Sequence, residues 1–570
     1  MDWEKLQNAP FKLDRTALKW VQNTLENMTV DQMIGQLFFI ELTGMEDAGY
    51  LRSVWEMEVG GLVYRSDTGF ALREKLLDAT KNARIPLLIG GNLESGSGGC
   101  LLGGTDMGSQ MLLAAGKDRE AGYRLGLVCC REAASAGVNC AFAPVVDLDL
   151  NFRNPITNTR TYGRNPDTVI DMASGYLKAA RECEIAASIK HFPGDGVDEY
   201  DQHFTTSENN LDSVQWEASY GKIYRALIGQ NALIVMVGHI SLPEISHMID
   251  STIDPHAPAT LNPAVLKGLL RDELGFNGMI LTDSSNMLSF LTYCSRKTAV
   301  PGAIASGCDM FLFNKNLAED MAYMKAGLEE GVLTPARLKE AVARILAVKA
   351  AIGLHKKQRE NRLVPHTSVL GHIGAAEHKT WARRIAEEGI TLVRDSQEML
   401  PLHPQRYPRL YLNVLQPEDS PATPLRKWCA ELLAREGFAV TLQDRKRSRD
   451  MSLSMQDNHL GVAWLKERFD AAVYIAAYTT PSNKLSIRLD WTGMHARGYD
   501  APWFIHEIPT LFISVGNPYH LFDVPYIKTY INAYASTETV LSVLMEKLTG
   551  RQEFAGTSPV DLCCDRWRVQ

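Results

Sequence analysis

Short apolar runs recur through the first 314 residues of the chain, and each ends at or just before a polar residue. The runs are QLFFIEL, GGLVYR, PLLIGGN, NCAFAPVVD, AASIK, ALIVMVGH, GMILTD and CDMFLFN. Between several of them, apolar residues recur at steps of three and four, as in PDTVIDMASGYLKAARECE and NPAVLKGLLRDEL. That period predicts helices. Alternating strands and helices predict parallel βαβ units, and wholly apolar strands suit a sheet that is buried on both faces.

Eight strand–helix units in about 300 residues match the size of a (β/α)8 barrel. We therefore predict an α/β chain whose catalytic domain is a TIM-like barrel over residues 1–353. The polar stretch that follows is broken by Pro and Gly, so we interpret residues 354–380 as a linker. Further apolar runs, from ITLVRD to TYINAYA, predict a C-terminal α/β sandwich domain over residues 381–570.

The composition narrows the class of protein. Apolar residues make up 45% and charged residues 22% of the chain, as in a globular protein, and the net charge of −8 comes without a basic face. We therefore expect no nucleic-acid partner. No apolar run is long enough to span a membrane, and the first residues lack the pattern of a signal peptide, so we expect a cytoplasmic protein without a membrane partner.

The ten cysteines do not form a metal-binding pattern. No C-x-x-C pair or His/Cys cluster has the spacing of a zinc site. The adjacent pairs Cys129-Cys130 and Cys563-Cys564 do not suit ordinary structural disulfides, so we expect mostly reduced, buried thiols. We predict neither a metal nor another cofactor.

The run AASIK leads into KHFPGDGVDEYDQH, which holds two His, four carboxylates and a Lys in fourteen residues. Pro193 ends any helix there, and Gly194 and Gly196 bracket Asp195, so the stretch predicts a loop at a strand end. A solvated acidic loop is the plainer interpretation. However, α/β barrels place their catalytic groups on such loops.

A second candidate is Asp283 in LTDSSNM, where the apolar run GMIL stops. A carboxylate at that place would face the barrel mouth in a partly dry setting and could act as a nucleophile or general base. Asp is also a good helix N-cap, and position alone does not separate the two roles.

The loop resembles the signature of glycoside hydrolase family 3, in its β-N-acetylglucosaminidase branch. That signature reads Lys-His-(Phe/Ile)-Pro-Gly-x-Gly, four residues, then Asp-(Ser/Thr)-His, and the chain matches it at Lys190, His191, Phe192, Pro193, Gly194, Gly196, Asp201 and His203. It departs at Asp195, usually His or Leu, and at Gln202, usually Ser or Thr. DQMIGQLFF, NCAFAPVVDLDLNFRNPITNTRTYG, MVGHI and ASGCDMFLF match further family motifs in order, so the resemblance covers the first 350 residues.

The resemblance implies catalytic roles for three positions. Asp283 matches the family's nucleophile, His203 its general acid/base, and Asp201 the carboxylate that partners this histidine. An unperturbed His has a pKa near ~6.5, so it can donate and accept a proton near neutral pH. Its partner would orient the ring and favour the imidazolium, as the Asp of a catalytic triad does.

Further positions are implied to hold the sugar. Lys190, His191 and Arg160, the last within TNTRTYG, match substrate-binding residues of the family. We expect His239 in MVGHI to line the same pocket, although a satisfied core histidine is the alternative. The family motif Asp-x-Glu-Gly-Gly-x-Val-x-Arg is altered here.

Asn92 stands in place of the Asp of that motif, and Cys100 stands in place of its Arg. Asn92 can still hydrogen-bond a sugar hydroxyl, but as a neutral group, and charge-assisted bonds are about twice as strong as neutral ones. The far side of the sugar is therefore expected to be recognised differently.

Together these matches predict a retaining β-N-acetylhexosaminidase that acts on a small carbohydrate through a glycosyl-enzyme. A phosphorylase is an alternative, because a neutral acid/base would not repel an attacking phosphate. A β-glucosidase of the same family, a catalytically inactive sugar-binding protein and a metal-dependent barrel hydrolase are the others. The metal enzyme would need several His at ligand spacing and would lose activity with a chelator.

Overall fold

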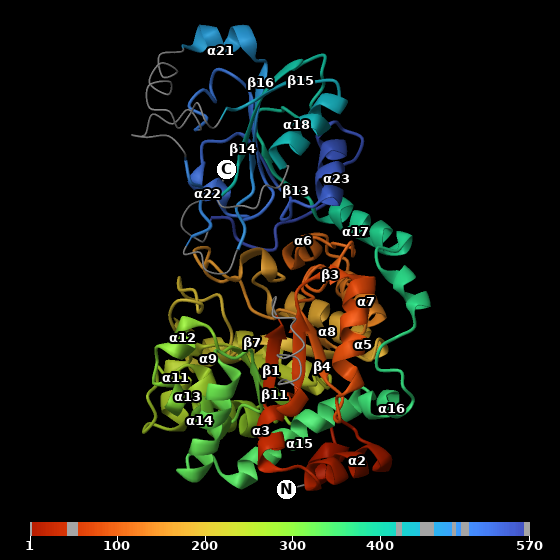
Figure 1. Cartoon of the computed structure of the whole chain (residues 1–570). Helices are drawn as coiled ribbons and strands as arrows, with labels where there is room; N and C mark the ends of the chain where they lie inside the picture. Colours follow the sequence, from red (N-terminus) through yellow and green to blue (C-terminus); the bar gives the residue numbers. More distant parts are fainter. Residues whose placement is uncertain are drawn as a thin grey trace. The chain divides into compact units, whose positions relative to one another are not determined.

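The computed structural model describes residues 3–42, 55–417, 425–444, 461–480, 486–491 and 501–563. The chain forms two compact units, whose positions relative to one another are not determined (Figure 1). The first comprises residues 1–106, 119–157 and 164–379, and the second comprises residues 107–118, 158–163 and 380–570. Two short segments of the N-terminal half thus fold with the C-terminal unit.

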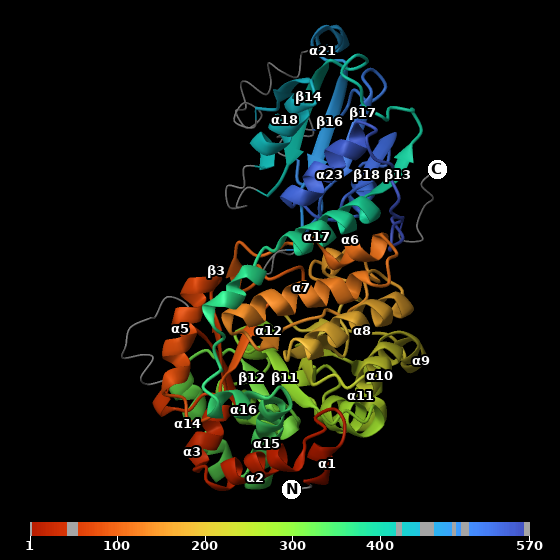
Figure 2. The same cartoon turned by 90° about the vertical axis from the view of Figure 1, so that its right-hand side faces the viewer.

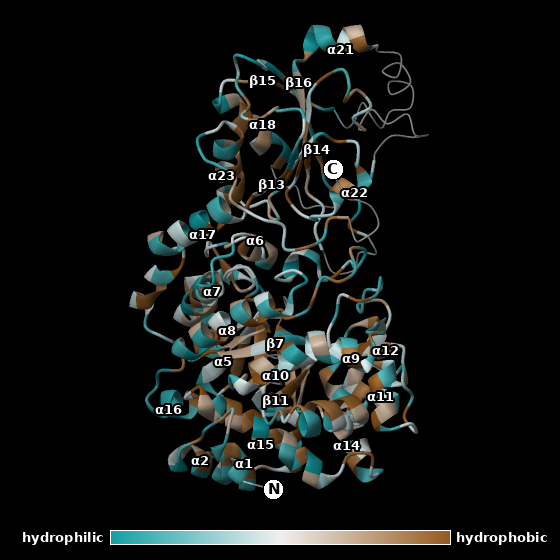
Figure 3. Cartoon of the chain, turned by 180° about the vertical axis from the view of Figure 1, so that it is seen from behind, coloured by the Kyte–Doolittle hydropathy of each residue, from teal (hydrophilic) through white to brown (hydrophobic). Residues whose placement is uncertain are grey.

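The first unit is built around a closed barrel of eight parallel strands, which confirms the predicted TIM-like barrel. In barrel order the strands are β1 (Phe38–Leu42), β12 (Met310–Leu312), β11 (Met279–Ser284), β9 (Ile234–Val237), β7 (Ala186–Phe192), β6 (Cys140–Ala141), β4 (Leu88–Gly91) and β2 (Gly61–Tyr64). All seven residues of β7 are buried, as a strand covered on both faces requires. In Figure 3, hydrophobic residues predominate on the strands, whereas the helices around them carry both kinds of residue.

Helices follow the strands around the barrel (Figures 1 and 2). They include α5 (Gly69–Lys81), α7 (Ala121–Ala136), α8 (Pro166–Glu182), α10 (Lys222–Gly229), the π-helical η4 (Ala264–Glu273), α13 (Arg296–Ser306), α14 (Leu317–Glu329) and α15 (Pro335–Ala351). Local sequence sets their ends. Asn165 caps α8 by accepting a hydrogen bond from the Asp167 N–H at 2.8 Å, and Gly137 ends α7 with a φ of 103°.

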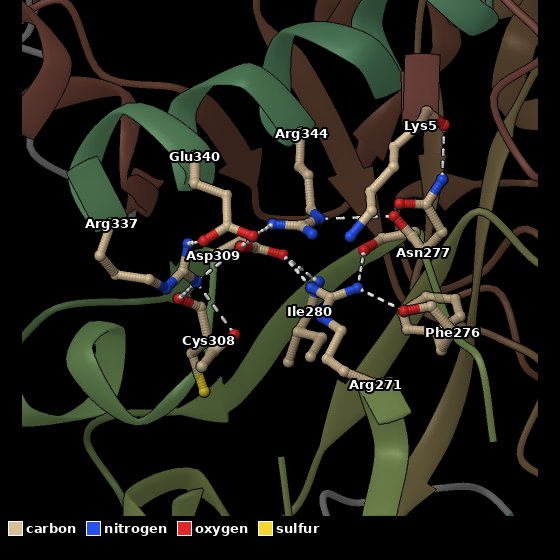
Figure 4. Close-up of polar contacts among 12 residues, drawn as sticks. Lys5, Arg271, Phe276, Asn277, Ile280, Cys308, Asp309, Arg337, Glu340 and Arg344 are labelled. Atoms are coloured by element: carbon tan, nitrogen blue, oxygen red, sulfur yellow. Dashed lines mark hydrogen bonds and ion pairs between the residues drawn. The ribbon is translucent and has the colours of Figure 1, made fainter. Parts of the chain in front are cut away.

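A fully buried carboxylate ties together the bottom of the barrel, at the N-terminal ends of β11 and β12 (Figure 4). Asp309 accepts hydrogen bonds from Arg271 and Arg337, each at 2.7 Å, and from the Ile280 N–H at 2.8 Å. Arg344 lies 3.8 Å away. Burial raises the pKa of Asp309, but the three guanidinium groups outweigh burial, so the net pKa lies below the usual carboxyl value.

The interval predicted as a linker, residues 354–380, contains α16 (Leu354–Arg359), the 3-10 helix η5 (Thr367–His372) and the start of α17 (Ala376–Gly389). It is held to α7 of the barrel unit, where the buried Glu132 accepts hydrogen bonds from the Gly374 N–H at 3.1 Å and from His378 at 2.7 Å.

The second unit contains a six-stranded mixed sheet. Its order is β13 (Thr391–Asp395), β18 (Thr529–Asn532), β17 (Thr510–Ser514), β16 (Ala471–Ala476), β14 (Arg409–Leu415) and β15 (Ala439–Leu442), with β13 antiparallel to β18 and the other pairs parallel. α18 (Leu425–Arg435) and α23 (Glu538–Leu548) lie on one face (Figures 1 and 2). Aromatic rings of Tyr474, Phe512 and Tyr530 stack across the strands within a buried cluster.

All nine described cysteines are free, and six are buried, as predicted for reduced thiols; Cys564 lies outside the described residues. None of the helices in the described part of the chain combines the length and apolarity needed to cross a membrane.

Candidate active site

Asp283 lies in β11 at the carboxyl end of the barrel and is only 6% exposed. Its Oδ1 accepts a hydrogen bond from the Ser284 N–H at 2.7 Å, and its Oδ2 lies 3.8 Å from Nε2 of His191. The next helix, α12 (Leu288–Leu291), begins after an N-cap at Met287. Asp283 therefore does not cap a helix, and its carboxylate belongs to the barrel mouth.

The electrostatic surroundings of Asp283 favour its ionised form. Burial raises its pKa, but charge interactions with His191 and His239, the Ser284 N–H and the Lys190 ammonium outweigh burial. The net pKa therefore lies below the usual carboxyl value, so the group is a carboxylate at neutral pH. An ionised carboxylate in a nearly dry site is a competent nucleophile.

His191 is oriented by the carboxylate of Asp147, for which no role was predicted. Asp147, just beyond β6, accepts a hydrogen bond from Nδ1 of His191 at 2.7 Å and from the His191 N–H at 3.1 Å. A third bond comes from the Asp195 N–H at 2.9 Å. Since a carboxylate only accepts, Nδ1 must carry the proton, and Nε2 faces Asp283. Asp147 ends the run NCAFAPVVD, the same signal that singled out Asp283.

Lys190 is also held inside the mouth, with 3% of its surface exposed. Its Nζ lies 2.6 Å from Oε1 of Glu94, a residue on the segment after β4. Glu94 is the Glu of the altered motif, and its pairing with Lys190 was not predicted. The Glu94 carboxylate holds the Lys190 ammonium group beside Asp283 and neutralises part of the charge of that ammonium group.

The two substituted residues of the altered motif, Asn92 and Cys100, differ in their exposure to solvent. Asn92, directly after β4, is exposed, and its backbone bridges to Gly99. Cys100 is buried, and its thiol lies 3.4 Å from the Ser97 carbonyl oxygen. Burial raises the pKa of Cys100 to about 12, so this thiol is neutral and unreactive. At the position of the motif's arginine, this chain therefore has a core residue.

The predicted acid/base pair is assembled in the structure. Nδ1 of His203 lies 2.6 Å from Oδ1 of Asp201, which also accepts the His203 N–H at 2.8 Å. Asp201 is fully buried, whereas 18% of the His203 side chain is exposed. The buried carboxylate can thus orient the ring, which remains partly exposed.

His239 lies in the core behind the mouth. It has no exposed surface, Nδ1 lies 2.9 Å from the Thr260 hydroxyl, and Nε2 lies 3.0 Å from the Ser284 carbonyl oxygen. The ring packs against Phe290, and burial lowers its pKa. Both ring nitrogens are therefore engaged, which corrects the expectation that His239 lines the pocket: it is a satisfied core histidine that supports the backbone after Asp283.

Arg160 ends the short helix η1 (Asn158–Arg160), within the segment that folds with the second unit. Its contact with the sugar therefore stays a prediction. Within the described residues, no group of three or more His, Cys, Asp or Glu side chains is arranged to hold a metal ion.

The family model "Glycosyl hydrolase family 3 N terminal domain" matches residues 29–348. The "Beta-N-acetylglucosaminidase/beta-glucosidase" of Cellulomonas fimi is 41% identical over 571 residues, which cover 99% of each chain.

Two solved structures extend this likeness. "Beta-glucoside phosphorylase BglX bound to 2FGlc" is 37% identical, with a TM-score of 0.93 over 99% of this chain and 100% of that chain. A family 3 beta-N-acetylglucosaminidase from Paenibacillus sp. str. FPU-7, at 23% identity, shares the fold with a TM-score of 0.78 over 94% and 99% of the two chains. The chain therefore belongs to glycosyl hydrolase family 3 and is a glycosidase.

Proposed function

We propose that the chain is a retaining β-N-acetylglucosaminidase that releases terminal β-linked N-acetylglucosamine. The observation that carries this proposal is the pairing of an ionised, buried Asp283 at the end of β11 with a His203–Asp201 pair on the loop after β7. β7 and β11 both pair with β9, so the two groups belong to one sector of the barrel. A nucleophile and a proton carrier are the two functions that glycoside cleavage needs.

In the first step, a carboxylate oxygen of Asp283 attacks the anomeric carbon. The bond from that carbon to the leaving oxygen breaks, and the His203 imidazolium donates its proton to this oxygen. The product is a glycosyl ester of Asp283 and a neutral imidazole. Asp201 stabilises the imidazolium before transfer and keeps the ring in position afterwards, through the 2.6 Å contact with Nδ1.

In the second step, neutral His203 accepts a proton from water, whose oxygen attacks the anomeric carbon and displaces the Asp283 carboxylate. Two inversions at one carbon give net retention of the β configuration. Lys190 and His191, which the Glu94 and Asp147 carboxylates hold in place, are positioned to bind sugar hydroxyls throughout.

Phosphorolysis is a second candidate, and the likeness to a β-glucoside phosphorylase over 99% of the chain favours it. After the first step, the acid/base is a neutral imidazole, whereas a carboxylate at the same place would repel an anion. At 4 Å and an effective dielectric constant of 20, that repulsion would be about 4 kcal/mol per pair of unit charges. Phosphate oxygen would then replace water, and the product would be an anomeric sugar phosphate.

The acid/base role is tested by His203→Ala on two substrates. A nitrophenolate leaves with little protonation, while a sugar alcohol needs a proton. General acid catalysis is typically worth ~10²–10⁴-fold, so the variant should lose about that factor on oligosaccharides and much less on nitrophenyl glycosides. An equal loss on both substrates would contradict the assignment.

The acceptor and the sugar are tested on the wild-type enzyme. Turnover of nitrophenyl N-acetylglucosaminide is measured in phosphate and in sulfate at equal ionic strength, and phosphorus NMR detects any sugar phosphate. Free sugar in both buffers supports hydrolysis, whereas sugar phosphate and faster turnover in phosphate support phosphorolysis. Faster cleavage of the glucoside than of the N-acetylglucosaminide would contradict the proposed sugar.

A further inference from the structure

The two positions at which the loop departs from the family signature contact each other. Nε2 of Gln202 donates to Oδ2 of Asp195 at 3.4 Å, and Oε1 of Gln202 accepts the His239 N–H at 2.8 Å. Both side chains are 1% exposed. Because a backbone N–H can only donate, the amide oxygen must face His239, and the amide nitrogen must face Asp195.

The main chain of Gln202 is fixed as well. The Ser289 hydroxyl donates to the Gln202 carbonyl oxygen at 2.5 Å, and the Leu288 N–H donates to the His203 carbonyl oxygen at 3.0 Å. Both donors belong to α12, which follows the strand that carries Asp283. Gln202 thus joins the acid/base loop to the end of β9 through its side chain and to α12 through its backbone.

Asp195 connects Gln202 to Asp147, a residue of the barrel mouth. Its N–H donates to Asp147, the carboxylate that orients His191, and its Oδ1 accepts hydrogen bonds from the Gly196 N–H at 2.7 Å and from Asn154 at 3.1 Å. Burial raises the pKa of Asp195 well above the carboxyl range, and the nearby Asp147 and Asp198 carboxylates raise it further. The protonated acid is therefore favoured, which avoids a second buried charge beside Asp147.

We propose that Gln202 and Asp195 are positioning residues that hold the His203–Asp201 pair in its catalytic place, an inference that rests on the proposed role of His203. A Ser or Thr at position 202 carries one oxygen two bonds closer to the backbone, so it cannot span from His239 to Asp195 as the amide does. In this chain the longer side chain of Gln202 and the buried acid Asp195 hold the acid/base loop in place, whereas the catalytic residues match those of the family.

The test is a double-mutant cycle between Gln202→Leu and His203→Ala. Gln202→Leu keeps most of the volume but removes both amide contacts. It should slow oligosaccharide cleavage about 10- to 100-fold, part of the value of general acid catalysis, and nitrophenyl glycoside cleavage less than about threefold. In the His203→Ala background, it should cost nothing further, because it acts through His203.

Two further variants separate positioning from general damage. Asp195→Ala removes the oxygen that accepts from the Gln202 nitrogen, so it should reproduce the selective loss on oligosaccharides. Ser207→Ala removes a 2.8 Å bond from the short strand β8 (Ser207–Glu208) to Asp198 and should leave both rates within about twofold. Melting temperatures confirm that each variant is folded.

Equal losses on both substrates, or a Gln202→Leu effect that persists undiminished without His203, would overturn the proposal. If His203→Ala slowed the cleavage of both substrates equally, the proposed acid/base role of His203 would be refuted, and the positioning role that depends on it would be refuted as well. That outcome is visible in the single variant, so the two failures are distinguishable.

Discussion

Asp147 is the residue whose removal tests the electrostatics of the mouth most sharply. It is 1% exposed and accepts three hydrogen bonds, two of them from His191. In Asp147→Asn, one oxygen can still accept the backbone N–H groups, but an NH2 replaces the oxygen that faces Nδ1. The ring must then carry its proton on Nε2 instead of on Nδ1.

The loss can be estimated from the 2.7 Å contact between Asp147 and His191. Hydrogen bonds to charged groups contribute about 1.5–3 kcal/mol, which corresponds to about 10- to 150-fold in kcat/KM. The variant also weakens the interaction with His191 that lowers the pKa of the Asp283 carboxyl. The pKa of Asp283 should therefore rise, and since the ionised form is the nucleophile, the acidic limb of kcat/KM should move to higher pH.

The assay is kcat/KM on a nitrophenyl glycoside from the acidic to the neutral range. The matched control is Asp395→Asn in the second unit, because Asp395 also accepts two backbone N–H groups and one side-chain donor. The control should lose stability but keep kcat/KM within about twofold. An Asp147→Asn variant with less than threefold loss and an unmoved acidic limb would refute this account of the mouth.

Two further predictions concern the barrel bottom and the altered motif. Asp309→Ala leaves three buried guanidinium groups without their carboxylate and should lower the free energy of unfolding by about 3–5 kcal/mol in urea titrations; a loss below 1 kcal/mol would contradict the pairing. Because the folded pKa of Asp309 is depressed, its stabilisation is present above the unfolded carboxyl pKa and is lost as pH falls through the lower folded value. Cys100 should resist iodoacetamide in the folded enzyme, and Cys100→Ala should keep kcat within about twofold; rapid labelling would show that the thiol is accessible.

The fold was largely predictable because strand ends carry a local signal. Asp283 ends an apolar run, and the structure places it in β11 at the mouth. The His203–Asp201 contact was implied by the resemblance of the loop to the family signature, in which these two residues are partners.

Other contacts join residues that no local pattern relates. Glu94 meets Lys190 only when β4 and β7 close into one barrel, and segments 107–118 and 158–163 join the second unit through tertiary packing. His239 was expected to line the pocket because it lies in the motif MVGHI, yet its ring is fully buried.

Trapping the covalent intermediate tests the central claim most directly. In a 2-fluoro glycoside, the fluorine slows both steps of the reaction, whereas a dinitrophenolate leaving group speeds the first step. The glycosyl-enzyme should therefore accumulate. Peptide mass spectrometry should find one fluorosugar on the peptide that contains Asp283, and Asp283→Asn should take up none. A label on another carboxylate, or equal labelling of the Asp283→Asn variant, would contradict the account.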